Sequence, residues 1–224
     1  MEQEIDIRKE LEAARAKARQ IPKLSGDSDE IDAYWEVVCG DVLAAEQNLR
    51  EQDRGWEIAS LTREFLQYAK PLEGYDHMLN SLYSAVSRMS KTLSDHPRLK
   101  IELLDFFLLV VNRIECQVGH ELGASEDLSI EINRLHRNCR YADNGEFDRI
   151  DDDRMLKYDP VEWTSKWEEV IDDADKIVYE RLADHPRGMG FCHAYWYERA
   201  QVLEENFGIV WRSPAIMNPG VKFD

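Results

Sequence analysis

The sequence has few basic residues for its size: 28 Lys and Arg side chains stand against 45 Asp and Glu, giving a net charge of −17. Sequence-independent binding to DNA or RNA depends on a basic surface that displaces counterions, so this charge argues against direct nucleic-acid binding. It argues equally against binding to an anionic membrane surface. Long hydrophobic runs are also missing, because the longest, residues 106–111, is far shorter than the roughly 20 residues of a membrane span. We therefore expect no membrane attachment.

Cysteine is sparse, with four residues that form no C-x-x-C pair. Secreted domains that rely on disulfides carry a denser cysteine framework, so we expect reduced thiols and a cytoplasmic protein. The first residues are acidic and then helical in pattern, without the basic stretch and apolar core of a signal peptide. Spacing alone remains compatible with two disulfides.

The common catalytic signatures are missing too. The sequence contains no G-x-S-x-G elbow, no Glu-x-x-His metal motif and no complete phosphate-binding loop. Cys192 and His193 are neighbours, but consecutive side chains on a helix point about 100° apart, which is poor geometry for a nucleophile and its base. We therefore expect no cofactor and favour a protein that is not an enzyme.

Helical periodicity dominates what is present. Apolar residues recur every three or four positions along most of the chain, and no stretch alternates convincingly as a strand would. The boundaries are marked by a helix start near Ser28, another at Pro97, and a left-handed cap at Gly208. Asp159 followed by Pro160 predicts a further helix start. The expected fold is all-α, a multi-helix bundle of about seven to eight helices.

The tail after Gly208 is unusually apolar but holds two prolines, which disfavour a regular helix. We expect this C-terminal tail to be extended and non-helical, and to pack on the bundle. Within it, Asn218-Pro219-Gly220-Val221 predicts a type II turn, with glycine at the position that needs a positive φ.

A polar segment at residues 138–153 ends in three aspartates and is the best candidate for a linker or long loop. The expected organisation is one α-helical domain over residues 1–224. The alternative is a subdivision into residues 1–140 and 154–224, joined by an acidic loop at 141–153.

The negative charge is concentrated in two stretches. Residues 27–53 hold nine acidic side chains against one basic, and residues 143–184 hold fifteen against six, which together equal the whole net charge. Both stretches are largely helical in pattern, so many carboxylates share exposed helix faces. Such faces either keep a protein soluble or attract a basic protein or a nucleic-acid-binding protein. The candidate partner-binding residues are Asp29, Glu30, Asp32, Glu36, Glu168, Glu169, Asp172 and Asp173.

Aromatic and basic residues gather in the last helix and in the tail behind it. Trp, Tyr and Arg are enriched in binding hot spots, so this cluster could line a ligand pocket or anchor a partner. The simpler interpretation, which we favour, is that the tryptophans fasten the apolar tail to the helix. The candidate residues are His193, Trp196, Tyr197, Arg199, Trp211 and Arg212.

One short sequence occurs twice, as Leu93-Ser94-Asp95-His96-Pro97-Arg98 and Leu182-Ala183-Asp184-His185-Pro186-Arg187, with five of six positions alike. Both copies lie between predicted helices, where proline ends one helix and begins the next, and we favour this junction role. The alternative is that the two copies form a joint site. Its weak candidates for metal ligands are Asp95, His96, Asp184 and His185.

The favoured hypothesis is a non-catalytic, acidic, cytoplasmic helical protein that binds another macromolecule, in the first instance a protein, through its acidic helix faces. The alternative is a small enzyme or ligand-binding protein, with or without a metal, whose site lies near the two Asp-His-Pro-Arg junctions and the last helix. The sequence carries no signal of an oligomeric state.

Overall fold

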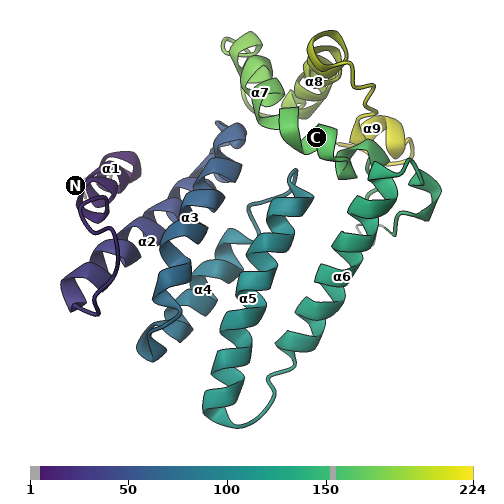
Figure 1. Cartoon of the computed structure of the whole chain (residues 1–224). Coiled ribbons are helices and arrows are strands. Elements are labelled where there is room, and N and C mark those ends of the chain that lie inside the picture. Colours follow the sequence, from purple (N-terminus) through teal and green to yellow (C-terminus); the bar gives the residue numbers. More distant parts are fainter. Residues whose placement is uncertain (1–5, 152–154, 224) are drawn as a thin grey trace.

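The structure, a computed structural model, describes residues 6–151 and 155–223. Within these residues the chain is all-α, and its helices pack as a multi-helix bundle without any strand (Figure 1). None of the helices described is long and apolar enough to cross a membrane. The α-helices are α1 (Ile7–Ala18), α2 (Ser28–Glu51), α3 (Ile58–Leu72), α4 (Leu79–Met89), α5 (Pro97–Val118), α6 (Ala124–Asp143), α7 (Ser165–Arg181), α8 (Phe191–Phe207) and α9 (Pro214–Met217). Four 3-10 helices connect them: η1 (Gly55–Glu57), η2 (Asp76–Met78), η3 (Phe147–Arg149) and η4 (Pro160–Trp163).

Three predicted helix boundaries are confirmed. Helix α2 begins at Ser28, with the side chain of Asp27 accepting a hydrogen bond from the backbone as its N-cap. Helix α5 begins at Pro97, whose missing N–H is no loss in a first turn. Helix α8 ends before Gly208, which has a φ of 64° and donates its N–H to the carbonyl of Glu204.

The predicted helix start at Pro160 is wrong by five residues. Residues 160–163 form the separate 3-10 helix η4, and Thr164 then turns into an extended conformation. The hydroxyl of Thr164 accepts a hydrogen bond from the backbone N–H of Trp167, so Thr164 is the N-cap of α7. The cap of Asp159 serves only the single turn of η4, because its side chain accepts from Val161. The break lets Trp163 and Trp167 point into different parts of the interior.

The predicted linker begins too early. Helix α6 continues through Asp143, so residues 138–143 are helical rather than part of a loop. The side chain of Asn138 is buried and bonds in both directions with the backbone of Asp151, at 2.7 and 3.0 Å. These bonds hold the segment after α6 against the helix. Residues 152 and 153 of the predicted acidic loop lie outside the described residues.

The buried apolar residues form two clusters. The first core is made by α1 to α6 together with Trp163. The second core is made by α7, α8 and the tail residues Ile209 and Trp211. Figure 1 shows α7 and α8 beside one end of the α2–α6 array. The subdivision of the chain into two domains stays a prediction, since two clusters can belong to one folding unit.

The C-terminal tail packs on the bundle as expected, but the prediction that it is non-helical is wrong at residues 214–217, which form the short helix α9. Pro214 takes the first position of α9, and Ser213 caps this turn through its side chain. A turn also closes from the N–H of Val221 to the carbonyl of Asn218, at 3.0 Å. It is not of type II, because Gly220 does not adopt a positive φ.

One ionisable cluster lies inside the first core, where α1, α2 and α3 meet. Asp41 is completely buried, and the guanidinium of Arg15 lies 3.5 Å from its carboxyl. Arg15 is bound more closely by Glu64, with 2.7 Å between Nε and the carboxylate. Burial raises the pKa of Asp41 to about 9, and the charge of Glu64 adds to the effect while Arg15 opposes it. Asp41 therefore carries a proton at neutral pH.

Candidate functional site

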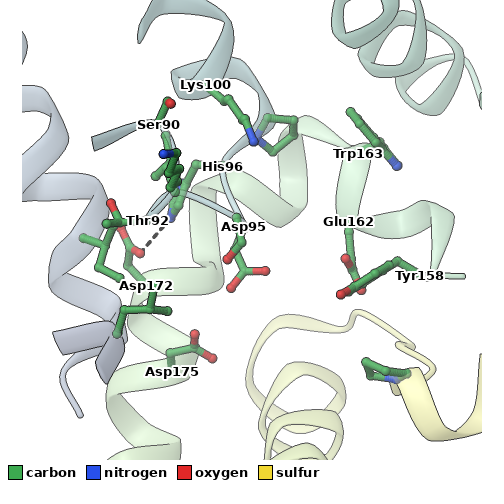
Figure 2. A pocket seen from close by; sticks show the side chains of 18 of the residues that line it. Ser90, Thr92, Asp95, His96, Lys100, Tyr158, Glu162, Trp163, Asp172 and Asp175 are labelled. Carbon is green, nitrogen blue, oxygen red and sulfur yellow. Dashed lines mark hydrogen bonds and ion pairs between the residues drawn. The ribbon is translucent and has the colours of Figure 1, made fainter. Parts of the chain in front are cut away.

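A cavity of about 730 Å³ lies between the two cores, and we call it the interface cavity. Its walls come from the segment between α4 and α5, from α5 and α6 on one side, and from α7, α8 and the tail on the other. Figure 2 shows its polar side chains converging on a common space. The polar lining includes Asp95, His96, Lys100, Asp172, Asp175 and Arg199. The aromatic lining consists of Tyr158, Trp163, Tyr179, Tyr195, Trp196 and Trp211.

The first Asp-His-Pro-Arg junction forms one edge of the cavity. Here α5 begins without a side-chain cap from its own chain segment. Glu168 of α7 supplies the cap instead, because its carboxylate accepts the backbone N–H groups of Arg98 at 3.0 Å and Leu99 at 2.9 Å. A carboxylate at a helix N-terminus also interacts favourably with the helix dipole. Glu168 thus fixes the position of α7 relative to α5.

His96 ties the same two helices together inside the junction. Its ring is buried, and Nε2 lies 2.8 Å from the carboxylate of Asp172 (Figure 2). The second ring nitrogen, Nδ1, is 3.8 Å from Glu168 and makes no hydrogen bond. Asp172 keeps a third of its side chain exposed, so its carboxylate faces both the imidazole and the cavity.

Arg199 of α8 is the central basic group of the cavity. Only 7% of its side chain is exposed, and its Nη2 lies 3.0 Å from Asp95 and 3.1 Å from Asp175. The rings of Trp167, Tyr195 and Trp211 surround the guanidinium carbon at 5.1, 5.5 and 5.3 Å. Burial alone would lower the pKa of Arg199, but the two carboxylates outweigh it and the pKa rises well above its ordinary value. Arg199 is therefore a permanent cation held by carboxylates and rings.

Asp175 is the most deeply buried carboxylate of this network. Burial raises its pKa to about 6, and the charges of Asp95 and Asp172 add to the rise while Arg199 opposes it. Its Oδ1 lies 2.9 Å from Nε of Arg199, although the pair does not have hydrogen-bonding geometry. A cavity lined by a buried acid with a shifted pKa is a typical functional-site candidate.

Two of the hydroxyl groups that line the cavity are engaged by the backbone. Among the lining residues that the structure describes, none is a cysteine. The hydroxyls of Ser90 and Thr92 donate to nearby backbone carbonyls, at 3.0 and 2.9 Å, rather than to a base. The described part of the chain also contains no group of three or more His, Cys, Asp or Glu side chains arranged to hold a metal ion.

The two Asp-His-Pro-Arg junctions do not meet. The first contacts the middle of α7, where His96 bonds to Asp172, whereas the second follows the end of α7. Asp184 and His185 are exposed, and the ring of His185 packs against Phe191 with centroids 5.9 Å apart. Each copy joins two helices, and only the first lines the cavity.

The six aromatic and basic candidates of the C-terminal region separate into three groups. Trp196, Arg199 and Trp211 line the cavity. His193 and Trp196 hold the chain end, since His193 bonds to the carbonyl of Phe223 at 3.1 Å and Trp196 packs against its ring. The other two candidates are remote from these contacts: Tyr197 is 63% exposed, and Arg212 pairs with Asp159 at 2.9 Å.

The acidic candidates lie on two separate surfaces. The candidates of α2 lie in the first turns of that helix, which is about 36 Å long. Its other end leads into η1, and η1 packs on α7 (Figure 1). Asp29 and Asp32 are exposed, while Glu30 bonds to Ser25 and Glu36 pairs with Lys17. On α7, Glu169 and Asp173 are exposed, but Glu168 and Asp172 serve the junction described above. The carboxylates therefore do not merge into one patch.

Two important cavity residues were not singled out from the sequence. Asp175 lies on the buried stripe of α7, between Ile171 and Val178 at helical spacing, and an acid on an apolar stripe is a usable signal of a buried ion pair. Glu162 is buried in η4 and accepts a hydrogen bond from the indole of Trp211 at 2.8 Å. No local pattern predicts that pairing, since the residues are far apart in sequence.

Comparison with known proteins adds no assignment: no family model, curated protein or solved structure matches this chain.

Proposed function

We propose that the protein binds a small molecule in the interface cavity and acts as a binding protein. The observation that carries this proposal is the cavity itself, about 730 Å³ between two cores, walled by aromatic rings and by fixed ion pairs. Pockets for small ligands are typically about 300–1,000 Å³, occur preferentially where structural units meet, and combine apolar walls with a few oriented polar groups.

The polar groups of this cavity are preorganised. Arg199, Asp95 and Asp175 form a buried network, and Asp172 is oriented by His96. Groups that are already held in place lose little conformational entropy when a ligand binds, so more of the interaction energy appears as affinity. Buried ion pairs are seldom more stabilising than apolar packing, so stability alone does not explain the network, and a role in binding does.

The test is a cavity-blocking substitution. Ser94 lines the cavity and is exposed, so Ser94→Trp places a large side chain in the cavity without displacing a buried residue. Ser84→Trp is the matched control, since Ser84 is exposed on α4 and does not line the cavity. A metabolite library screened by thermal shift should give ligands that stabilise the wild type and the Ser84 variant but not the Ser94 variant. Ligands that bind all three proteins alike would contradict the proposal.

A second candidate function is the binding of a basic protein or a nucleic-acid-binding protein in the cytoplasm. The exposed carboxylates of Asp29, Asp32, Glu169 and Asp173 and the net charge of −17 support it. Because the two acidic surfaces are separate, neutralising one pair at a time identifies the surface used. Asp29→Asn with Asp32→Asn, or Glu169→Gln with Asp173→Asn, should abolish a salt-sensitive interaction in only one case. A partner retained equally by both double variants would contradict this candidate.

A further inference from the structure

The carboxylates on the α7 side of the interface cavity outnumber the basic groups beside them. Asp95, Asp172 and Asp175 approach the same part of the cavity (Figure 2), and Arg199 is the permanent cation bonded to two of them. Asp172 is bonded to the imidazole of His96. This part of the cavity therefore presents an excess of negative charge to whatever enters it.

Two of these carboxylates are accessible from the cavity. About a third of each side chain, 32% for Asp95 and 33% for Asp172, is exposed. Each uses one oxygen within the protein, because Oδ2 of Asp95 bonds to Arg199 and Oδ1 of Asp172 bonds to His96. The remaining oxygen of each makes no hydrogen bond to any residue that the structure describes. Both are therefore acceptors for a donor on a ligand.

Aromatic rings line the same cavity as these acceptors. Tyr179 of α7 and Trp196 of α8 line the same side of the cavity. The protein binds one planar cation of its own in this way, because the guanidinium of Arg199 contacts two carboxylates and three aromatic rings. Carboxylates combined with ring faces are the usual recognition elements for ammonium and guanidinium groups.

We propose that the ligand of the interface cavity is an organic cation, an amine or a guanidinium, whose charged group lies between Asp95 and Asp172 and whose apolar part packs against Tyr179 and Trp196. This inference rests on the proposed function and specifies its ligand class. An inorganic cation fits less well, because the described residues offer no cluster of three metal-ligating side chains. An anion at the same position would lie against the carboxylates of Asp95 and Asp172, whereas the basic lining residues also include Lys91, Lys100 and Arg134.

Three probes that share one ring separate these classes: phenethylamine is cationic, 2-phenylethanol neutral and phenylacetate anionic. Agmatine adds a guanidinium without a ring. We expect saturable binding of phenethylamine and agmatine by calorimetry and tryptophan fluorescence, and no saturable binding of 2-phenylethanol or phenylacetate. Asp172→Asn should weaken cation binding by about 10- to 100-fold, the range for losing one charge-assisted hydrogen bond.

The matched control is Asp173→Asn, which removes the same charge from the neighbouring residue. Asp173 is exposed and does not line the cavity, so this variant should bind the cations as the wild type does. The side-chain amide of the Asp172→Asn variant would retain an oxygen that accepts from His96, and thermal unfolding of both variants checks that the fold is intact.

The outcomes distinguish this inference from the proposed function. Binding of phenylacetate but not of phenethylamine, or equal losses in the Asp172 and Asp173 variants, would overturn the cation assignment. The failure of both cations to bind would overturn it as well. In each case the cavity function would still stand if another ligand bound the wild type and was excluded by Ser94→Trp.

Discussion

The buried carboxyl of Asp41 predicts an unusual dependence of stability on pH. Its pKa is about 9 in the folded protein, whereas an aspartate in an unfolded chain titrates near pH 3.9. Between these values the native state binds one proton more than the unfolded state does. Stability from this group is therefore present at low pH and is lost as the pH rises towards 9, with a slope of about 1.4 kcal/mol per pH unit.

Asp41→Asn removes this titration while retaining the shape of the side chain. Between pH 5 and pH 8 the wild type should lose about 4 kcal/mol through Asp41, and the variant should lose none. The stability of the variant relative to the wild type should accordingly rise by about 4 kcal/mol over this range. Other titrating groups are common to both proteins and cancel in the difference.

The assay is urea unfolding followed by circular dichroism at several pH values, with Asp32→Asn as the control. Asp32 belongs to the same helix but is exposed, so the stability of its variant should track the wild type. If the difference between Asp41→Asn and the wild type stayed constant from pH 5 to pH 8, Asp41 would be ionised in the native state. The account of the buried cluster would then be wrong.

Three further predictions concern a helix cap, a glycine and two cysteines. Glu168→Ala removes two hydrogen bonds to the start of α5 and should lower the free energy of unfolding, measured by urea titration, by about 2 kcal/mol. The control is Glu169→Ala, because Glu169 is exposed; this variant should change the free energy of unfolding by less than about 0.5 kcal/mol. Gly208→Ala places a β-carbon at a φ of 64° and should lower the midpoint of thermal unfolding, at a cost of about 1 kcal/mol. Burial raises the pKa of Cys139 to about 11, so its thiol should resist iodoacetamide in the native protein at pH 8, whereas the exposed Cys116 should be labelled. Mass spectrometry of peptides measures the labelling of both residues. Rapid labelling of Cys139 would contradict its buried position.

Helix boundaries were predictable where the signal is local. The proline at the start of α5 and the glycine after α8 each act through their own backbone, so no distant partner is needed to interpret them. The error at Pro160 also comes from local signals, because two residues that can cap a helix, Asp159 and Thr164, lie only five positions apart. Sequence alone does not show that the first serves a single turn.

The cavity was only partly predictable because it is built from distant contacts. The sequence indicated Asp95, His96 and Arg199, and the structure places all three in one cavity. The two Asp-His-Pro-Arg copies were interpreted first as helix junctions, with a joint site as the alternative. Only the first copy lines the cavity, whereas the second follows the end of α7, and a repeated sequence carries no information about the distance between its copies. The acidic candidates were chosen as exposed carboxylates, yet Glu168 and Asp172 bond to groups of the α4–α5 junction that are some 70 residues away in the chain.

The cap that Glu168 places on α5 makes one half of the molecule depend on the other. Helix α5 is the main apolar helix of the first core, but the backbone groups at its beginning are completed by a carboxylate from the second. A fragment that ends before α7 would leave these N–H groups to water and would fray at its most hydrophobic helix. The start of α5 is thus completed by a side chain from α7, so hydrogen bonds join the two cores although their buried apolar clusters are separate.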